Sequence, residues 1–343
     1  MIYAPIIIPT LCRYEHFVRL MESLKNNTWA QYTDVYVALD YPPSEKYEEG
    51  YNSICKYLES DFSCFANFCV IKRTYNMGSF ANCESAIAQV LTKYDRFIRT
   101  DDDTEFSPNF LEYMNKCLME YENDDDVIAV TGYSYPIKWK VSDGSKVLKE
   151  NFICPMWGTG FWRDRYKNLY NYIDIEGGLA KDARMTIQNG GLGRMTDICR
   201  KEFAELCLSP DFKETLAAKV TDISVRMYMA IKNKYVIMPT ISKVRNWGFD
   251  GSGEYCGMSV GNGKQVNAKN YPYQLQQIDE DDKFVLVKDD LHEICINRKR
   301  MNRFDTSPIM RKIKMYVKLS LCYLLGARFF NKVIILYRSL VSR

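Results

Sequence analysis

The chain has 343 residues, and its 46 Lys and Arg nearly balance its 43 Asp and Glu, for a net charge of +3. With 47% apolar and 26% charged residues it has the composition of a folded globular protein, which excludes an intrinsically disordered chain. Its 12 cysteines form no CxxC pair and have only His16 and His292 as potential partners. The sequence therefore favours reduced thiols in a cytosolic protein over a zinc or thioredoxin-like site.

The first part of the chain alternates between short apolar runs and stretches in which apolar residues have helical spacing. The apolar runs predict strands at 4–8, 34–39, 67–72, 96–100 and 127–131, and the stretches between them predict helices at 15–25, 45–59, 79–94 and 108–121. The strands recur about every 30 residues, the length of one βα unit, so we expect an α/β fold with a mostly parallel sheet flanked by helices. Further helices are expected at 196–206 and 215–233.

Three acids, Asp101, Asp102 and Asp103, come directly after the fourth predicted strand. Adjacent carboxylates at the end of a buried strand repel one another and resist burial, so something must compensate their charge. A divalent cation with oxygen ligands would do so, and such ions usually bridge a carboxylate to substrate phosphates. Open α/β sheets bind ligands at the carboxyl ends of their strands, which favours an active site here over a solvated acidic turn.

Polar residues also follow the first three predicted strands: Thr10 and Arg13, then Asp40, then Asn76 and Gly78. Asp40 could accept hydrogen bonds from a base or ribose, or it could be a turn acid before two prolines. Asn76 and Gly78 could form a helix N-cap or an anion site at a helix N-terminus. The first strand is not followed by G-x-G-x-x-G, and the chain contains no G-x-x-x-x-G-K-[ST], so we expect neither a dehydrogenase-type dinucleotide site nor a P-loop.

The residues from Asp101 to Tyr113 resemble the "E-D-D…P-x-F…Y" segment of the N-acetylglucosaminyltransferase I-like glycosyltransferases, with Asp in place of the family's first Glu. The opening Ile6-Ile7-Ile8-Pro9-Thr10, Asp40 and the Asn76-Met77-Gly78 turn are similar to the wider GT-A, family 2 pattern. The segment from Pro239 to Ser252 resembles the donor loop "P…S-R…N-x-G…G". The resemblance implies a GT-A fold, a Rossmann-like nucleotide-binding sheet, and sugar transfer with inversion that uses a divalent metal.

Carried over by position, the resemblance implies that Asp103 coordinates Mn²⁺ or Mg²⁺ against the donor diphosphate. Asp102 would face the ribose and Asp101 the donor sugar. The other residues expected at the nucleotide-sugar site are Pro9, Thr10, Arg13, Asp40, Asn76, Gly78, Asn246, Gly248, Gly251 and Ser252. The last four could close over the diphosphate, because glycine permits close backbone approach. Their loop contains no histidine, so one possible additional metal ligand is missing from it.

An inverting transfer also needs a base that takes the proton from the acceptor hydroxyl. The resemblance places this base at Asp222, at the start of a predicted helix, although the same position would suit a helix cap. Asp197, which also begins a predicted helix, is the alternative.

Aromatic residues flank glycines in the segment that contains Trp157, Gly158, Phe161 and Trp162. These residues could form a lid or a platform on which a donor or acceptor sugar stacks. Core packing is the alternative for both tryptophans.

The C-terminal segment 298–343 carries twelve Lys and Arg against one acid, Asp305, or +11, which leaves −8 for the rest of the chain. Basic and apolar residues alternate from 310 to 337, and the longest uncharged run, 319–327, is far shorter than the roughly 20 residues of a membrane span. We expect an amphipathic helix on an anionic membrane surface. Docking of its apolar face on the rest of the protein is the alternative, and no nucleic acid is expected as a partner.

Together these features predict a metal-dependent, inverting glycosyltransferase (a hexosyltransferase-type enzyme). It would move a sugar from a nucleotide-diphosphate donor, most readily a UDP-sugar, to a hydroxyl of a glycan acceptor. We expect this acceptor to be lipid-linked, as in surface polysaccharide synthesis. Residues 1–297 would form the catalytic domain, with a nucleotide-binding half to about 131 and an acceptor half from about 132, and 298–343 would attach it to the cytoplasmic face of the membrane. A nucleotidyltransferase remains an alternative, although it should carry a Gly- and Lys-rich phosphate loop after the first strand. A second alternative is a non-catalytic glycan-binding protein with the same fold.

Overall fold

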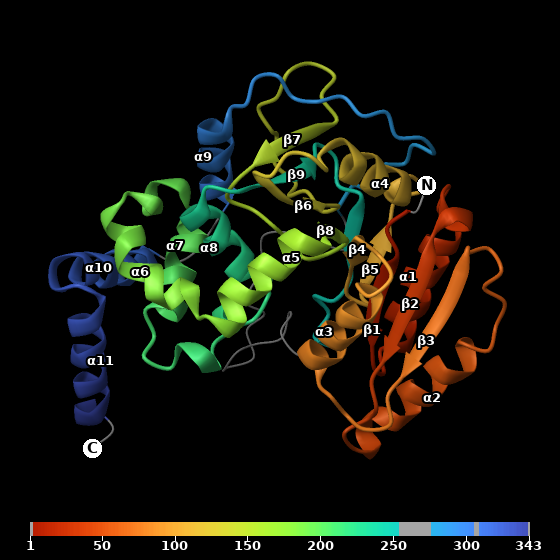
Figure 1. Cartoon of the computed structure of the whole chain (residues 1–343), viewed down its shortest axis with the longest axis horizontal. Coiled ribbons are helices and arrows are strands. Elements are labelled where there is room, and N and C mark those ends of the chain that lie inside the picture. The colour runs from red at the N-terminus through yellow and green to blue at the C-terminus, as the bar shows by residue number, and fades with distance from the viewer. Residues whose placement is uncertain (1–2, 254–275, 305–308, 342–343) are drawn as a thin grey trace.

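The computed structural model describes residues 3–253, 276–304 and 309–341, which form an eight-stranded sheet flanked by helices (Figure 1). The strand order is β3-β2-β1-β4-β8-β6-β9-β7. The strands are β1 (Ile6–Thr10), β2 (Asp34–Leu39), β3 (Asn67–Lys72), β4 (Arg96–Arg99), β6 (Val127–Thr131), β7 (Val147–Glu150), β8 (Thr159–Trp162) and β9 (Tyr235–Pro239). Only β7 and β8 of this sheet run antiparallel to their neighbours, so the expected α/β fold with a mostly parallel sheet is confirmed.

The first part of the chain follows the predicted rhythm. The five predicted strands are β1, β2, β3, β4 and β6, and the helices between them are α1 (Tyr14–Lys25), α2 (Glu48–Tyr57), α3 (Ser79–Val90) and α4 (Phe110–Glu120). α2 is preceded by a 3₁₀ turn, Glu45–Tyr47, which the sequence predicted as part of the helix. The agreement arises because each element has a continuous apolar run or a single buried helix face.

The two faces of the sheet bury separate hydrophobic clusters. Along β1, Ile6 and Ile8 point to one cluster and Ile7 to the other, as the twofold period of a strand requires. The first cluster also takes the buried residues of α1, α2 and α4, and the second takes those of α3.

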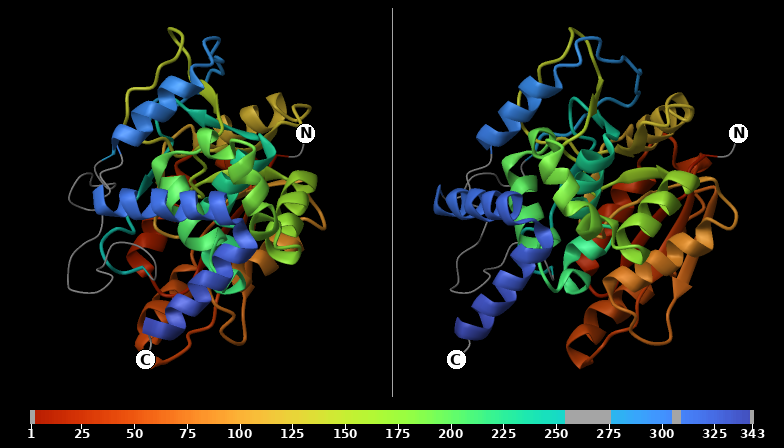
Figure 2. Two further views of the ribbon diagram at one scale, coloured as in Figure 1. Left: turned by 90° about the vertical axis from the view of Figure 1, so that its left-hand side faces the viewer. Right: turned by 60° about the vertical axis from the view of Figure 1, so that its left-hand side comes forward.

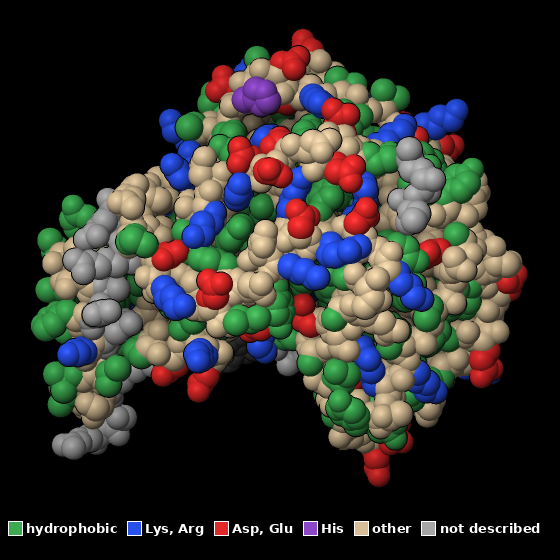
Figure 3. All heavy atoms as spheres, in the orientation of Figure 1, with side chains coloured by type: hydrophobic (Ala, Val, Ile, Leu, Met, Phe, Trp, Pro, Cys, Tyr) green, Lys and Arg blue, Asp and Glu red, His purple; other side chains and the backbone are tan. Residues whose placement is uncertain are grey.

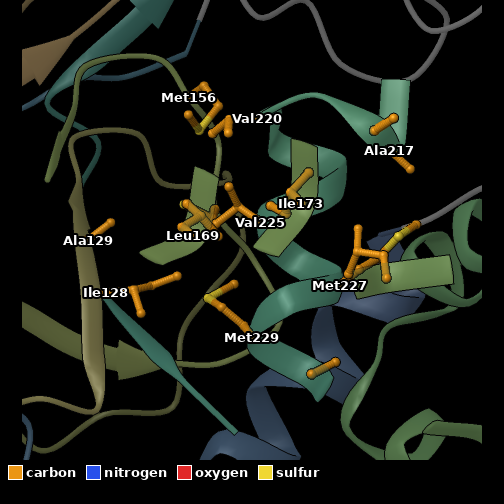
Figure 4. Close-up of a cluster of buried hydrophobic side chains, with 14 of the residues drawn as sticks. Ile128, Ala129, Met156, Leu169, Ile173, Ala217, Val220, Val225, Met227 and Met229 are labelled. Carbon is orange, nitrogen blue, oxygen red and sulfur yellow. The ribbon is translucent and has the colours of Figure 1, made fainter. Parts of the chain in front are cut away.

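Helices that follow β8 in the chain cover the second face. These are α5 (Arg163–Tyr170), α6 (Gly178–Gln188), α7 (Asp197–Glu202) and α8 (Asp222–Lys232). Leu169 of α5 and Met229 of α8 pack with Ile128 of β6 in one continuous core (Figure 4). The helix predicted at 196–206 is α7 followed by a π-helical turn, Phe203–Cys207. The helix predicted from 215 begins only at Asp222, where Thr221 and Ser224 form a capping box.

A separate ribbon joins two short strands that the sequence did not predict. β5 (Thr104–Phe106) pairs antiparallel with β10 (Val244–Asn246), in the register Arg245 to Glu105. Strands of three residues have too little pattern to be recognised, and this pair is formed between distant parts of the chain. The ribbon brings the residues after β10 to the aspartate triplet.

The C-terminal residues form α9 (Ile294–Phe304), α10 (Ile309–Leu325) and α11 (Ala327–Val341). The boundary predicted after residue 297 falls inside α9, whose Asn297 side chain accepts from the backbone N–H of Lys140 at 2.7 Å. The single amphipathic helix predicted over 310–337 is instead two helices, which break at Gly326 with a φ of +76°. In the described parts of the chain, none of the helices has the length and apolar character needed to cross a membrane.

Candidate active site

The aspartate triplet lies at the carboxyl end of β4, beside the carboxyl end of the parallel strand β1. Thr10, the last residue of β1, donates its hydroxyl to Asp102 Oδ2 at 2.9 Å. The Arg13 guanidinium donates to Asp102 Oδ1 and, at 2.8 Å, to Asp103 Oδ2. Pro9 precedes Thr10 within β1. The structure therefore joins the polar residues of the two strand ends, as the sequence predicted.

Arg13 compensates much of the buried negative charge. Asp102 and Asp103 are each 5% exposed, so both ion pairs with Arg13 are largely shielded from water. Burial alone would lower the pKa of Arg13, but the charges of Asp102 and Asp103 outweigh it and raise that pKa. Burial also raises the pKa of Asp103, with Arg13 opposing the effect.

Asp101 is less well compensated than its neighbours. Its burial, together with the nearby charge of Asp103, raises the pKa of Asp101 to about 7, although Arg99 and Arg13 oppose the shift. Among the described residues, no hydrogen-bond donor lies on its carboxylate. Arg99, at the end of β4, is buried and donates to the backbone oxygen of Val220 at 3.5 Å. Asp101 is thus the member of the triplet that is poised to meet a ligand.

The residues after β10 enclose Asp103 from the other side. Asn246 Nδ2 donates to Asp103 Oδ1 at 3.1 Å, and the backbone N–H of Trp247 donates to the Asp103 carbonyl oxygen at 2.8 Å. Asn246 Oδ1 accepts from the backbone N–H of Gly248 at 2.9 Å. A Cβ atom at Gly248 would lie 2.0 Å from Asp103 Oδ2, so only glycine allows this close approach. The loop and the triplet predicted from the sequence form one site.

The loop contains no histidine of its own, but one from the first helix lies beside it. His16 of α1 places Nε2 2.9 Å from Asp250 Oδ2 and 3.2 Å from the Ser252 hydroxyl. One turn further along α1, the Arg19 guanidinium lies 4.2 Å from the centroid of the Trp247 ring. Neither contact follows from the loop sequence alone; the spacing of His16 and Arg19 by three residues on the first helix was the available signal. Gly251, between these contacts, has a φ of +92°.

Asp40 ties the end of β2 to the turn before α3. It accepts from the backbone N–H groups of Met77 and Gly78, each at 2.9 Å, and from Asn76 Nδ2 at 3.3 Å. Asn76 does not cap α3: its side chain also donates to the carbonyl oxygen of Tyr41 at 2.6 Å, and Gly78 occupies the cap position. Asp40 is therefore a turn-holding acid at the same edge of the sheet, and a contact with a base or ribose remains a prediction.

The four residues predicted as a lid separate into two pairs. Phe161 and Trp162 lie in β8 and are buried in the core, where Trp162 Nε1 donates to the Leu118 carbonyl oxygen at 3.2 Å. The lid prediction is wrong for these two, because β8 runs between β4 and β6 in the centre of the sheet. Trp157 instead makes an edge contact with Phe249 of the loop after β10, at 5.8 Å between ring centroids. Gly158 follows it with a φ of +60°.

The two candidate bases lie in different surroundings. Asp222 opens α8 two residues after Val220, the backbone partner of Arg99, and its side chain is 45% exposed and paired with Arg226 at 2.8 Å. Thr221 caps the helix, so Asp222 is not needed as the cap.

Asp197 also follows a capping threonine, but the C-terminal helices cover it. Its carboxylate accepts from Arg200 at 2.9 Å and from the Tyr316 hydroxyl of α10 at 3.4 Å, while its backbone N–H donates to Asn302 of α9 at 2.8 Å. These contacts place Asp197 at a junction with the C-terminal helices, and the assignment of the base to Asp222 remains a prediction.

A divalent cation at the triplet would find hard carboxylate oxygens, but few of them. The described residues contain no group of three or more His, Cys, Asp or Glu side chains that could hold a metal ion. Both oxygens of Asp103 accept hydrogen bonds, from Arg13 and Asn246. A cation at the triplet would therefore need further ligands from a substrate diphosphate, as Mg²⁺ commonly does, because the protein alone offers too few.

No known family model matches the sequence, and no curated protein matches it either. Among solved structures, the chain is similar to S. aureus TarS at 15% identity and a TM-score of 0.28, over 44% of this chain and 21% of TarS. Structures of TarS 1–349 with UDP and with UDP-GlcNAc match at 16% identity, with TM-scores of 0.28 and 0.27, over 44% of this chain and 35% and 34% of theirs. The chain thus spans about a third or less of these proteins, and neither a shared activity nor membership of the N-acetylglucosaminyltransferase I-like family follows from the matches.

Proposed function

We propose that the protein is a glycosyltransferase that takes a sugar from a nucleotide-diphosphate donor, most readily a UDP-sugar. The observation that carries the proposal is the convergence of Thr10, Arg13, Asn246 and Gly248 on the aspartate triplet at the carboxyl edge of a parallel sheet. A purely structural acidic turn would have no need of a half-buried arginine, a loop folded back over it and an acid whose pKa is raised to about 7.

The site combines carboxylates that could hold a cation with the positive charge of Arg13, and both features suit a diphosphate. Mn²⁺ or Mg²⁺ would be held by Asp103 with Asp101 beside it, and would stabilise the negative charge that develops on the leaving diphosphate. Arg13 would add a fixed positive charge on the same side, since it already lies between Asp102 and Asp103. His16 and Arg19 would hold the loop after β10 in place over the donor.

The transfer itself would be a single displacement with inversion. The acceptor oxygen forms a bond to the anomeric carbon, the bond from that carbon to the diphosphate oxygen breaks, and the nucleoside diphosphate leaves with the electron pair. Asp222 takes the proton of the acceptor hydroxyl, a role that suits a partly exposed carboxylate at the start of a helix. The acceptor would be a glycan, and the C-terminal helices described below are the reason to expect a lipid-linked one.

Donor binding tests this proposal directly. Calorimetric titration with UDP, GDP and CDP, each with Mn²⁺ and with EDTA, should show binding of one nucleotide that requires the cation. Asp103→Asn should abolish that binding, and Asp282→Asn, at an exposed acid outside the site, should leave it unchanged. Binding of all three nucleotides alike without a cation would contradict the proposal. Release of pyrophosphate from a nucleoside triphosphate and a sugar 1-phosphate would instead identify a nucleotidyltransferase.

A further inference from the structure

Helix α10 has two apolar stripes on opposite sides. The first consists of Met315, Leu319 and Cys322, which are buried against the second-face core, where α10 contacts α6 and α7. The docking alternative for the C-terminal segment is thus correct for this stripe. The second stripe follows the same helical spacing half a turn away and is exposed; it consists of Met310, Ile313, Val317, Leu321 and Leu324. Leu324 is 75% exposed, so α10 has apolar surface beyond what its docking buries.

Helix α11 has an exposed apolar face of its own. Phe330 is buried in the core and Ile334, one turn further, packs against it; the end of the helix then leads away from the body of the protein (Figures 1 and 2). Phe329, Val333, Leu336 and Leu340 are spaced at i, i+4, i+7 and i+11, so they share one face. All four are exposed, Leu336 at 62% and Leu340 at 64%. Hydrophobic side chains accordingly line this edge of the molecule in Figure 3.

The charges on this segment have a single sign. Residues 309–341 contain seven Lys and Arg and neither Asp nor Glu. Of these, Lys314 and Lys318 lie beside the exposed stripe of α10, and Lys332 is exposed on α11. An apolar stripe bordered by basic side chains matches the boundary between acyl chains and anionic headgroups.

We propose that the exposed stripes of α10 and α11 form a docking surface for an anionic lipid bilayer. The apolar side chains would enter the headgroup region while the lysines contact lipid phosphates. A second copy of the chain fits less well, because a symmetric pairing would bring the same basic residues face to face. This inference stands apart from the proposed activity, since neither stripe contains a residue of the candidate active site.

Vesicle binding by the full chain tests the proposal. The wild type should sediment with vesicles of phosphatidylcholine and phosphatidylglycerol, and far less with phosphatidylcholine alone or at high salt. Leu336→Gln should weaken the apparent partition coefficient about tenfold, because one apolar contact with the acyl region is lost. The matched control is Ile335→Gln. Ile335, next to Leu336 in the sequence, is also apolar and 55% exposed, but it lies on the helix face of Lys332 and Ser339. This variant should therefore keep vesicle binding within about twofold of the wild type.

The outcomes separate the possible occupants of this surface. Equal losses for Leu336→Gln and Ile335→Gln, or absence of wild-type binding to the anionic vesicles, would overturn the proposal. So would a wild-type dimer in light scattering that Leu336→Gln dissociates, because a second copy would then cover the stripe. Leu340→Gln, one turn further along the same face, should repeat the effect of Leu336→Gln.

Discussion

Asp101 should lower the stability of the folded protein while it serves the proposed activity, so that one substitution can measure both effects. Burial, with the charge of Asp103 second, raises the pKa of Asp101 from its ordinary value of 3.8 to about 7. Between these two values the folded protein keeps a proton that the unfolded chain has lost. The stability of the wild type should therefore fall as the pH rises through this window, and the loss should be complete above about pH 7.

We expect Asp101→Asn to be more stable than the wild type at neutral and higher pH, because the amide cannot ionise. A carboxyl with a pKa near 7 in place of 3.8 costs the folded state up to about 4 kcal/mol once ionised. For a chain of 343 residues this corresponds to a rise in Tm of up to about 5 °C. The variant should at the same time lose most of its transfer activity, since it removes a charge that faces the donor.

The assay is thermal unfolding followed by circular dichroism across this pH range. The difference in Tm between Asp101→Asn and the wild type should be small near the acid end of the window and largest above about pH 7. A variant less stable than the wild type at high pH, or a difference that does not change with pH, would refute the reasoning about burial.

Three other substitutions probe the parts of the site. Arg13→Met should lower the free energy of unfolding by about 2–4 kcal/mol in urea titrations, because it leaves two buried carboxylates unpaired; a change near zero would mean that water already screens these pairs. Gly248→Ala should weaken cation-dependent donor binding at least about tenfold in calorimetry, since its Cβ overlaps a carboxylate. Gly193→Ala, where an added Cβ meets nothing within 4 Å, is its control. Asp222→Asn should lower kcat about 100-fold or more in a coupled assay of nucleotide release while donor affinity is kept. Asp197→Asn should keep kcat, and the reverse pattern would make Asp197 the base.

The fold of roughly the first 131 residues was predictable because its information is local. Each of the strands β1 to β4 contains a short apolar run, and each helix after it has one apolar face, so type and order follow from periodicity. The aspartate triplet was recognisable for the same reason: its position after β4 fixes the edge of the sheet at which it lies.

The remainder depends on contacts between distant parts of the chain. β10 becomes a strand by pairing with β5, and His16 meets Asp250 only through that pairing. The Gly- and Trp-rich segment around Trp162 has a composition that suits a lid or a core strand equally well. Its place between β4 and β6 decides the matter, and no local pattern records that place.

The central claim is that the triplet supports sugar transfer from a nucleotide donor, and donor hydrolysis measures it most directly. A panel of UDP- and GDP-sugars would be incubated with the wild type, Asp103→Asn and the exposed control Asp282→Asn, with Mn²⁺ and with EDTA. The account predicts slow hydrolysis of one donor that requires Mn²⁺, persists in Asp282→Asn and is lost in Asp103→Asn. Hydrolysis that survives in Asp103→Asn, or a wild type that releases no nucleotide from any donor with the cation present, would contradict it.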